Sequence, residues 1–336
     1  MRQMKNKIKI IYILGDGHSG STILSLILGS HTGIESGGEL TAFDGRKRYL
    51  LANQTISNKP LCSCRTAISK CEYWSKVMDR LSKAYDPRAL EINSNDKERF
   101  ETSNYGIIKV MLEVSGKRLI CDSSKELPRL TRLLGGKCFD VFIVHLIRDA
   151  RAVAYSYKRS GAWYKSEGLL TEDRRHFYDF DNAARRWQST NIAAFLECQK
   201  RKGSYICIRY EDLIADPKKY ISMILERIGL RFEDNQLNFW RYPHHYLGGN
   251  VTRLKGKQEI KADISYLDNV SDEEWQRATR LAYDGLKLFG YSMKKGDPPM
   301  PVSDNLIKKR AYWVLPAYFT KHYIARLIQR SSFKVK

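Results

Sequence analysis

A short stretch near the start of the chain, rich in glycine and hydroxyl residues, has the composition of an anion-binding turn. It runs from Gly15 to Thr22 (GDGHSGST), between the apolar runs Ile8–Leu14 and Ile23–Leu28. This order predicts a strand, a tight turn and a helix that begins on hydroxyl residues. The first amides of a helix have no intrahelical acceptor and carry partial positive charge, so such a turn attracts an anion. A glycine-rich turn without a ligand is the alternative that this stretch alone leaves open.

The spacing of this turn is close to that of the nucleoside-triphosphate loop, G-x-x-x-x-G-K-[ST]. Gly15 and Gly20 have the required separation, and Thr22 occupies the Ser/Thr position. Ser21, however, stands where the lysine would be. That lysine reaches the β- and γ-phosphates of a triphosphate. We therefore expect this loop to bind a smaller 5′-phosphate group, and a nucleotide kinase or NTPase with a degenerate loop is the alternative.

Polar residues also follow three later apolar runs of the chain, Arg118–Cys121, Phe139–Ile147 and Tyr205–Arg209, which we predict to be strands. These strand ends are Asp122 to Lys125, Arg148, and Arg209 to Glu211. We also expect a polar turn at His31–Gly38 and helix over residues 76–116. Apolar runs that alternate with helical segments predict an α/β fold with a central, mostly parallel sheet that helices cover on both faces. Ligands bind outside the carboxyl ends of the strands in such sheets. We therefore expect the turn and the three later strand ends to form one site.

Four segments in order resemble the sulfotransferases that use 3′-phosphoadenosine 5′-phosphosulfate (PAPS). The segments lie within residues 8–253 and read GDGHSGSTIL, LIRDARAVAYSYKRSG, IRYEDLIADP and HHYLGGNVTR. The first is similar to the 5′-phosphosulfate loop of that family, the second to its 3′-phosphate segment, and the last to the loop that closes over the nucleotide. The resemblance implies a three-layer, P-loop-like α/β fold. It also implies transfer of a sulfuryl group from PAPS to a hydroxyl acceptor by in-line displacement, and no metal is expected.

The expected nucleotide contacts follow from this resemblance and from the two separate anionic groups of PAPS. The phosphosulfate is expected to bind amides and side chains of Gly17, His18, Ser19, Gly20, Ser21 and Thr22. Arg148 would offer a planar guanidinium fork to the 3′-phosphate, and Ser156, about two helical turns later, a hydroxyl. A surface ion pair with Asp149 or another neighbour is the alternative for Arg148. The remaining expected contacts are Tyr210, Gly249, Asn250 and Arg253.

Three side chains are candidates for catalysis. Glu39, in GGEL, resembles the glutamate of tyrosylprotein and some carbohydrate sulfotransferases and is the expected base for the acceptor hydroxyl. Lys125 is expected to stabilise the transferring group or the leaving oxygen, and Asp122 to orient Lys125 or act as a second base. His18 stands where many family members have Lys or Arg. It would donate a hydrogen bond to the oxygen that bridges the phosphate and the sulfate of PAPS. Surface or packing roles are the alternatives for Glu39, Lys125 and His18.

The remaining histidines and arginines of these segments have weaker cases. His145 lies inside an apolar run and is expected in the core, whereas His244 and His245 are outside candidates for a histidine base. Arg151 and Arg159 are expected either in solvent or near the phosphate.

Seven cysteines occur in the chain, and three of them form a C-x-C-x6-C pattern. These are Cys62, Cys64 and Cys71, which make a weak zinc signal because no fourth ligand is evident. A local disulfide or loop packing is therefore expected. The other four lie in or near apolar segments and are predicted to be buried thiols. The odd number of cysteines and the lack of a secretory signal favour a reducing compartment, so we expect a cytoplasmic location.

The charge of the chain predicts anionic partners. It has 58 Lys and Arg against 37 Asp and Glu, a formal net charge of +21. No nucleic-acid-binding motif is visible, so nucleic acid is not expected as a partner. The likeness to carbohydrate sulfotransferases favours a carbohydrate or glycolipid acceptor. A non-enzymatic module that binds acidic glycans or lipids is the further alternative.

The C-terminal part of the chain differs from the rest. We expect a sulfotransferase domain over 1–295 and a basic amphipathic extension over 296–336. Residues 305–336 contain eight Lys and Arg and no acidic residue, and a helix beginning at Pro316 would gather Phe319, Tyr323, Ile324, Leu327 and Ile328 largely on one face. This pattern predicts a helix on an anionic membrane surface, at the inner face of a membrane. Packing on the domain or on a partner is the alternative.

Overall fold

In the computed structural model, the described residues are 7–43, 55–56, 59–60, 62–86, 89–201, 203–297, 299–300, 303, 306–316 and 318–319. The chain divides into two compact units. The first comprises residues 1–147 and 194–262, and the second comprises residues 148–193 and 263–336. Among the described residues, no helix is long and apolar enough to cross a membrane.

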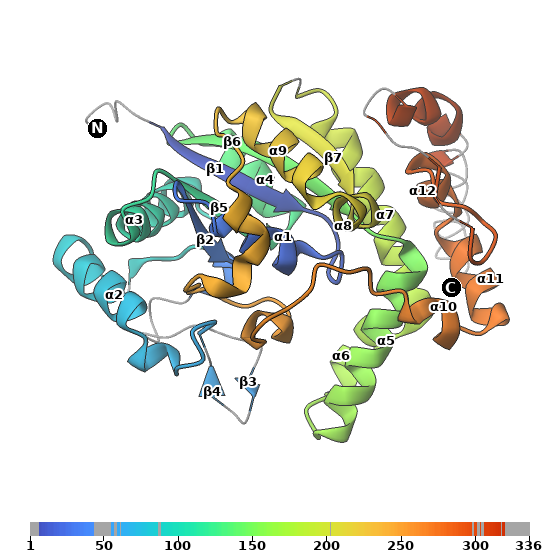
Figure 1. Cartoon of the computed structure of the whole chain (residues 1–336), viewed down its shortest axis with the longest axis horizontal. Coiled ribbons are helices and arrows are strands. Elements are labelled where there is room, and N and C mark those ends of the chain that lie inside the picture. Colours follow the sequence, from blue (N-terminus) through green and yellow to red (C-terminus); the bar gives the residue numbers. More distant parts are fainter. Residues whose placement is uncertain are drawn as a thin grey trace, which may run out of the picture. The chain divides into compact units, whose positions relative to one another are not determined.

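The first unit is built on a five-stranded, all-parallel sheet with the order β2-β5-β1-β6-β7 (Figure 1). Its strands are β1 (Ile8–Leu14), β2 (Ile34–Gly38), β5 (Leu119–Lys125), β6 (Phe139–Ile147) and β7 (Tyr205–Arg209). Nearly all their residues are buried, because strands covered on both faces read as continuous apolar runs. β1 is the central strand, so the turn that follows it lies at the middle of the sheet's carboxyl edge.

Helices cover both faces of this sheet. On one face, Ile11 and Ile13 of β1 belong to a core formed with α1 (Ser21–Gly29), α8 (Tyr210–Ala215), α9 (Pro217–Arg227) and the 3-10 helix η5 (Asp234–Arg241). On the other face, the Tyr12 hydroxyl donates to the carbonyl of Glu126, which precedes α4 (Leu127–Gly135). This three-layer arrangement confirms the predicted α/β fold.

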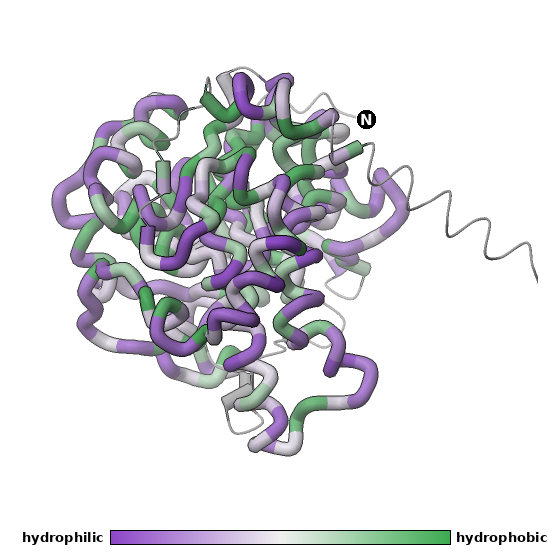
Figure 2. Tube along the Cα trace, turned by 90° about the vertical axis from the view of Figure 1, so that its right-hand side faces the viewer, coloured by the Kyte–Doolittle hydropathy of each residue, from purple (hydrophilic) through white to green (hydrophobic). Residues whose placement is uncertain are grey.

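The other elements of the first unit lie before β5 or after η5. They are η1 (Leu40–Ala42), β3 (Thr55–Ile56), β4 (Lys59–Pro60), η3 (Ile68–Lys70), α2 (Glu72–Ala84), α3 (Lys97–Ser115) and η6 (Val251–Leu254). The hydropathy-coloured trace shows short hydrophobic and hydrophilic stretches that alternate along the chain (Figure 2).

The second unit is helical and packs around Trp187. Its helices are α5 (Ala150–Ser166), α6 (Glu172–Tyr178), most of α7 (Phe180–Cys198), α10 (Ser265–Asn269), α11 (Asp272–Leu281) and α12 (Tyr283–Leu288), with a further helical stretch at 306–316. Trp187 is fully buried, and its indole N–H donates to the carbonyl of Arg148 at 2.8 Å. A Cβ at Gly285 would lie 2.7 Å from the Trp187 ring, so α12 needs glycine there to approach this closely.

Several predicted boundaries differ from the structure. The stretch His31–Gly38 was expected to be a turn, but Ile34–Gly38 is the edge strand β2. This strand packs closely against α1, because a Cβ on Gly29 of α1 would lie only 2.4 Å from the Ser36 Cβ of β2. Residues 76–116 do not form one helix, because α2 ends at Ala84 and α3 begins after Asp96, whose side chain accepts the Arg99 N–H at 2.7 Å.

The expected C-terminal helix differs as well. The helix does not begin at Pro316, because residues 306–316 are already helical, as are residues 318–319. The predicted apolar residues Tyr323, Ile324, Leu327 and Ile328 lie outside the described residues, so that part of the amphipathic face stays a prediction.

Candidate functional site

The glycine-rich turn after β1 packs tightly against Tyr210, the residue that follows β7. Gly20 has a φ of 93°, which favours glycine, and a Cβ there would lie 2.4 Å from the Tyr210 ring. Tyr210 therefore lies directly against the loop. α1 begins at Ser21 with no side-chain cap and no acidic residue in its first turn. The positive end of this helix is consequently available to an anion from outside the chain.

Two loop residues have features that are common where ligands bind. The Ser19 side chain is only 2% exposed, and its Oγ has no hydrogen-bond partner among the described residues. Buried hydroxyls normally have one, so this Oγ suits an oxygen of a bound anion. His18 is half-buried with a φ of 59°, a left-handed conformation that costs energy for a residue with a Cβ.

The predicted catalytic residues Glu39 and Lys125 form an ion pair. The Lys125 ammonium donates to the Glu39 carboxylate and, at 3.0 Å, to the Ser123 carbonyl. Glu39 follows β2 and Lys125 ends β5, its neighbour in the sheet. The side chains are 29% and 15% exposed, so a ligand can reach them. A carboxylate here can accept a hydroxyl proton, and the ammonium can offset negative charge.

The segment Tyr246–Asn250 connects this ion pair to the loop. The Leu247 carbonyl accepts the Glu39 N–H at 2.7 Å, and the Asn250 N–H donates to Thr22 Oγ1 at 3.1 Å. Gly248 and Gly249 have φ values of 61° and 77°, and a Cβ at Gly249 would lie 2.6 Å from the Tyr246 ring. The structure thus brings Gly249 and Asn250 beside Thr22, while their contact with a nucleotide stays a prediction.

Arg253 follows this segment in η6. It is buried and lines a pocket together with Trp240, His244 and Gln258. Its predicted contact with a nucleotide is not tested by this placement.

Asp122 has a different role from the one predicted. Its fully buried carboxylate accepts hydrogen bonds from Arg129 Nε at 3.0 Å and from the Ser124 hydroxyl at 2.6 Å. Arg129 is also fully buried and donates to the Asn104 amide oxygen at 2.8 Å. The prediction that Asp122 orients Lys125 is therefore wrong. Its burial with a compensating guanidinium also argues against a second base, because an acceptor hydroxyl has no access to it.

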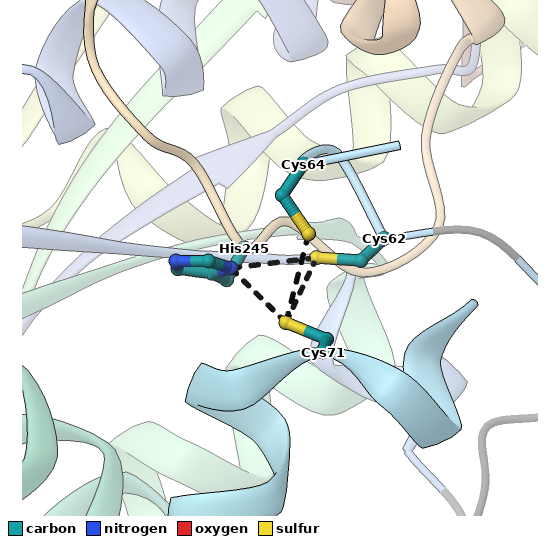
Figure 3. Close-up of side chains that lie close together, drawn as sticks. All are labelled: Cys62, Cys64, Cys71 and His245. Atoms are coloured by element: carbon teal, nitrogen blue, oxygen red, sulfur yellow. Dashed lines mark hydrogen bonds between the residues drawn. The ribbon is translucent and has the colours of Figure 1, made fainter. Parts of the chain in front are cut away.

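The histidines considered as outside candidates have structural contacts. His145 is buried in β6 with Nδ1 at 3.0 Å from the Tyr205 hydroxyl, which confirms the expected core position. His244 Nε2 lies 2.9 Å from the Phe239 carbonyl, and burial lowers the pKa of His244 to about 4. Its ring is therefore neutral and donates from Nε2. The His245 ring lies among three cysteines (Figure 3).

The expected disulfide is wrong. All seven cysteines are described by the structure, and all are free thiols. Cys62, Cys64 and Cys71 instead converge with His245, a residue that no local pattern in the sequence linked to them (Figure 3).

The residues predicted to bind the 3′-phosphate belong to the second unit. Arg148 is buried and directly follows β6 in the chain; its Nη2 donates to the Asp263 carbonyl at 2.8 Å and lies 3.4 Å from the Asp263 carboxylate. Arg159 is exposed and lies 3.8 Å from the same carboxylate. Two guanidinium groups thus approach one anion here. Ser156 is buried, and its hydroxyl donates to the Ala152 carbonyl at 2.9 Å.

Arg151 is neither in solvent nor placed to bind phosphate. It is buried, forms an ion pair with Asp149 at 2.6 Å and lies over the Trp275 ring at 4.0 Å from the ring centroid. The carboxylate that approaches Arg148 is that of Asp263, which agrees with the alternative of an ion pair with a neighbour. Burial opposes charge on Arg151, but the nearby carboxylate outweighs it and raises the pKa of Arg151 above its usual value.

A parallel α/β sheet with a glycine-rich turn between its central strand and a helix defines the class of P-loop-like proteins. Within this class, the family model described as "Sulfotransferase family" matches residues 11–234, and the chain belongs to that family.

Individual relatives are distant. Mouse carbohydrate sulfotransferase 2 is 24% identical over 209 residues, which cover 53% of this chain and 36% of the mouse protein. A Caenorhabditis briggsae protein named "Putative protein-tyrosine sulfotransferase" is 25% identical over 199 residues, 56% of this chain and 65% of that protein. The match thus spans about a third to two thirds of these relatives. The solved sulfotransferase domain from the curacin biosynthetic pathway is 21% identical, covers 92% of this chain and 98% of that domain, and has a TM-score of 0.49.

Proposed function

We propose that the protein is an enzyme that transfers a sulfuryl group from PAPS to a hydroxyl acceptor. The observation that carries this proposal is the Glu39–Lys125 ion pair, which the segment Tyr246–Asn250 connects to the glycine-rich loop at the uncapped start of α1. The chain's membership of the sulfotransferase family supports the same chemistry. The absence of a lysine at Ser21 disfavours triphosphate hydrolysis.

The residues of the first unit suit the roles that this reaction requires. PAPS would supply the sulfuryl group. The amides at the start of α1 and the hydroxyls of Ser19, Ser21 and Thr22 would hold the phosphosulfate, and the buried, unpaired Ser19 Oγ fits an anionic oxygen. Lys125 would offset the negative charge of the transferring group, and Glu39 would take the proton of the acceptor hydroxyl.

Arg148 and Ser156 are our proposed ligands for the 3′-phosphate. The Asp263 carboxylate beside Arg148 and Arg159 supports the idea that this part of the second unit tolerates an anion. A phosphate would have to displace that carboxylate, and the Ser156 hydroxyl would have to turn from the Ala152 carbonyl.

The proposed acceptor is a carbohydrate or a glycolipid. The likeness to mouse carbohydrate sulfotransferase 2 supports this class. A tyrosine-containing peptide is the competing acceptor, because the Caenorhabditis briggsae relative carries a protein-tyrosine name at similar identity. Both acceptors offer a hydroxyl to Glu39.

A contact with an anionic membrane surface is part of this proposal. The Tyr312 and Trp313 side chains are 74% and 73% exposed in the helical stretch 306–316, which also carries Lys308 and Lys309. Exposed aromatic rings beside lysines suit the interface of an anionic bilayer.

A thermal-shift experiment tests the nucleotide assignment. The purified chain is heated with adenosine 3′,5′-bisphosphate, with ATP and Mg²⁺, or with heparin. A ligand at a hundred times its Kd stabilises the folded state by about 2.7 kcal/mol, which raises Tm by several degrees. We expect this shift with the bisphosphate. A shift with ATP and Mg²⁺ alone would support a nucleotide kinase or NTPase instead, and one with heparin alone a glycan-binding module.

A further inference from the structure

Three cysteines and one histidine from distant parts of the chain converge within the first unit (Figure 3). The side chains are those of Cys62, Cys64, Cys71 and His245, and their four ligand atoms all lie within 4.8 Å of one another. We propose that these residues bind one structural zinc ion. None of these four residues is among the groups proposed to bind PAPS.

The distances match those of a tetrahedral Cys₃His site. Zinc–sulfur bonds of about 2.3 Å and a zinc–nitrogen bond of about 2.0 Å separate two sulfurs by about 3.8 Å, and a sulfur and the nitrogen by about 3.5 Å. Cys71 Sγ lies 3.6 Å from Cys62 Sγ and 3.7 Å from Cys64 Sγ. His245 Nδ1 lies 3.2 Å from Cys71 Sγ and 3.6 Å from Cys62 Sγ. One ion therefore fits among the four atoms without a large rearrangement.

Neither alternative accounts for this arrangement as well. A disulfide needs two sulfurs about 2.05 Å apart and would leave a third thiol and the imidazole without a reason to converge. Loop packing alone would not require all four donor atoms to point toward a common centre, as they do in Figure 3. A zinc ion requires such convergence.

Neighbouring groups hold the ligands in place, as expected of a built metal site. The His245 ring stacks on Tyr73, with centroids 4.6 Å apart and planes 6° apart, and the Trp74 indole N–H donates to the His245 carbonyl at 3.0 Å. Cys71 is the residue before α2, where the positive end of a helix favours a thiolate. The Thr66 hydroxyl lies 3.0 Å from Cys64 Sγ and can donate to it.

The ligand set indicates a structural ion. Four protein ligands complete a tetrahedron and leave no open position for water or substrate, whereas catalytic zinc sites keep one. Cys62 and Cys71 are buried. The ion would join the segment 62–71 to a histidine 174 residues later than Cys71.

The consequence concerns the segment that contacts the proposed catalytic residues. His245 immediately precedes Tyr246, whose hydroxyl lies 2.6 Å from the Ser123 hydroxyl, and Leu247, which accepts the Glu39 N–H. Zinc at His245 would therefore fix the start of the segment Tyr246–Asn250. We infer that the ion orders the loop expected to close over the nucleotide.

Metal analysis of the full chain tests the proposal. The chain is expressed in zinc-supplemented medium, purified under reducing conditions and measured by elemental mass spectrometry and X-ray absorption. We expect about one zinc per chain, with three sulfur neighbours at about 2.3 Å and one nitrogen at about 2.0 Å. Cys71→Ser and His245→Ala should each lower the zinc content by about tenfold or more. Cys198→Ala, which removes a buried thiol far from this cluster in the sequence, should leave it unchanged.

Two results would overturn the proposal. One is wild-type protein with reduced cysteines and less than about a tenth of a zinc per chain. The other is bound zinc with only oxygen and nitrogen neighbours. Both measurements use the wild-type chain, so a variant that fails to fold changes neither result. Neither depends on sulfuryl transfer, so the zinc site and the proposed function can fail separately.

Discussion

Replacing the proposed base by its amide, Glu39→Gln, tests the catalytic assignment with little change of shape. The glutamine side chain can still accept the hydrogen bond from the Lys125 ammonium, but it cannot take a proton from the acceptor hydroxyl. The backbone contact of residue 39 with Leu247 is also kept, because it involves only main-chain atoms.

The expected magnitudes differ sharply between activity and stability. General-base catalysis typically contributes about 10²- to 10⁴-fold in rate, which corresponds to about 3 to 5 kcal/mol of barrier. The ion pair itself is partly exposed, so solvent screening limits its loss to about 1 kcal/mol or less of folding free energy. We therefore expect kcat to fall by about a hundredfold or more, with Tm lowered by at most about 2–4 °C.

The assay is transfer of radiolabelled sulfate from saturating PAPS to neutral oligosaccharides, with calorimetric titration of adenosine 3′,5′-bisphosphate alongside. Glu126→Gln is the matched control, because Glu126 is exposed and adjacent to Lys125 in the chain. The control should transfer at the wild-type rate. If Glu39→Gln binds the bisphosphate normally and turns over within about threefold of wild type, the base is another group.

Three further substitutions test the other parts of the account. Gly20→Ala should abolish the thermal shift with adenosine 3′,5′-bisphosphate, because the added Cβ would clash with the Tyr210 ring. The control Gly116→Ala, at a φ of 71° with nothing within 4 Å, should cost only about 1 kcal/mol of stability and keep the shift. Equal shifts in both variants would show that the loop is not part of the nucleotide site. Arg148→Ala should raise the Kd for the bisphosphate, measured by titration calorimetry, by about tenfold to a hundredfold. Asp263→Asn should lower the same Kd by about threefold to fivefold. Unaltered affinities would exclude Arg148 and Asp263 from the 3′-phosphate site. Trp313→Ser should reduce binding to phosphatidylserine vesicles by about tenfold in a sedimentation assay, with neutral vesicles as control, and undiminished binding would contradict the membrane contact.

Strands with a strong apolar pattern were predictable from the sequence. The predicted limits of Phe139–Ile147 and Tyr205–Arg209 are those of β6 and β7, because buried parallel strands are continuous apolar runs bounded by polar residues. The glycine turn was predictable for a related reason. Its residue types are rare in combination and occur directly between two such runs.

Features that depend on long-range contacts were not predictable. β2 consists of Ile34–Gly38, whose small residues carry no strand pattern, and its burial results from packing against α1. The ion pair of Asp122 with Arg129 was missed because the short segment DSSK suggested Lys125 as the nearer partner. His245 could not be matched to the cysteine motif, since only the folded chain brings the two segments together.

Sulfuryl transfer itself is the most direct test of the central claim. The purified chain is incubated with radiolabelled PAPS, a panel of neutral oligosaccharides and, separately, a tyrosine-containing peptide. We predict labelled acceptor together with an equal amount of adenosine 3′,5′-bisphosphate, at a rate that Glu39→Gln lowers by about a hundredfold or more. Unchanged PAPS with every acceptor, together with hydrolysis of ATP in the presence of Mg²⁺, would contradict the account.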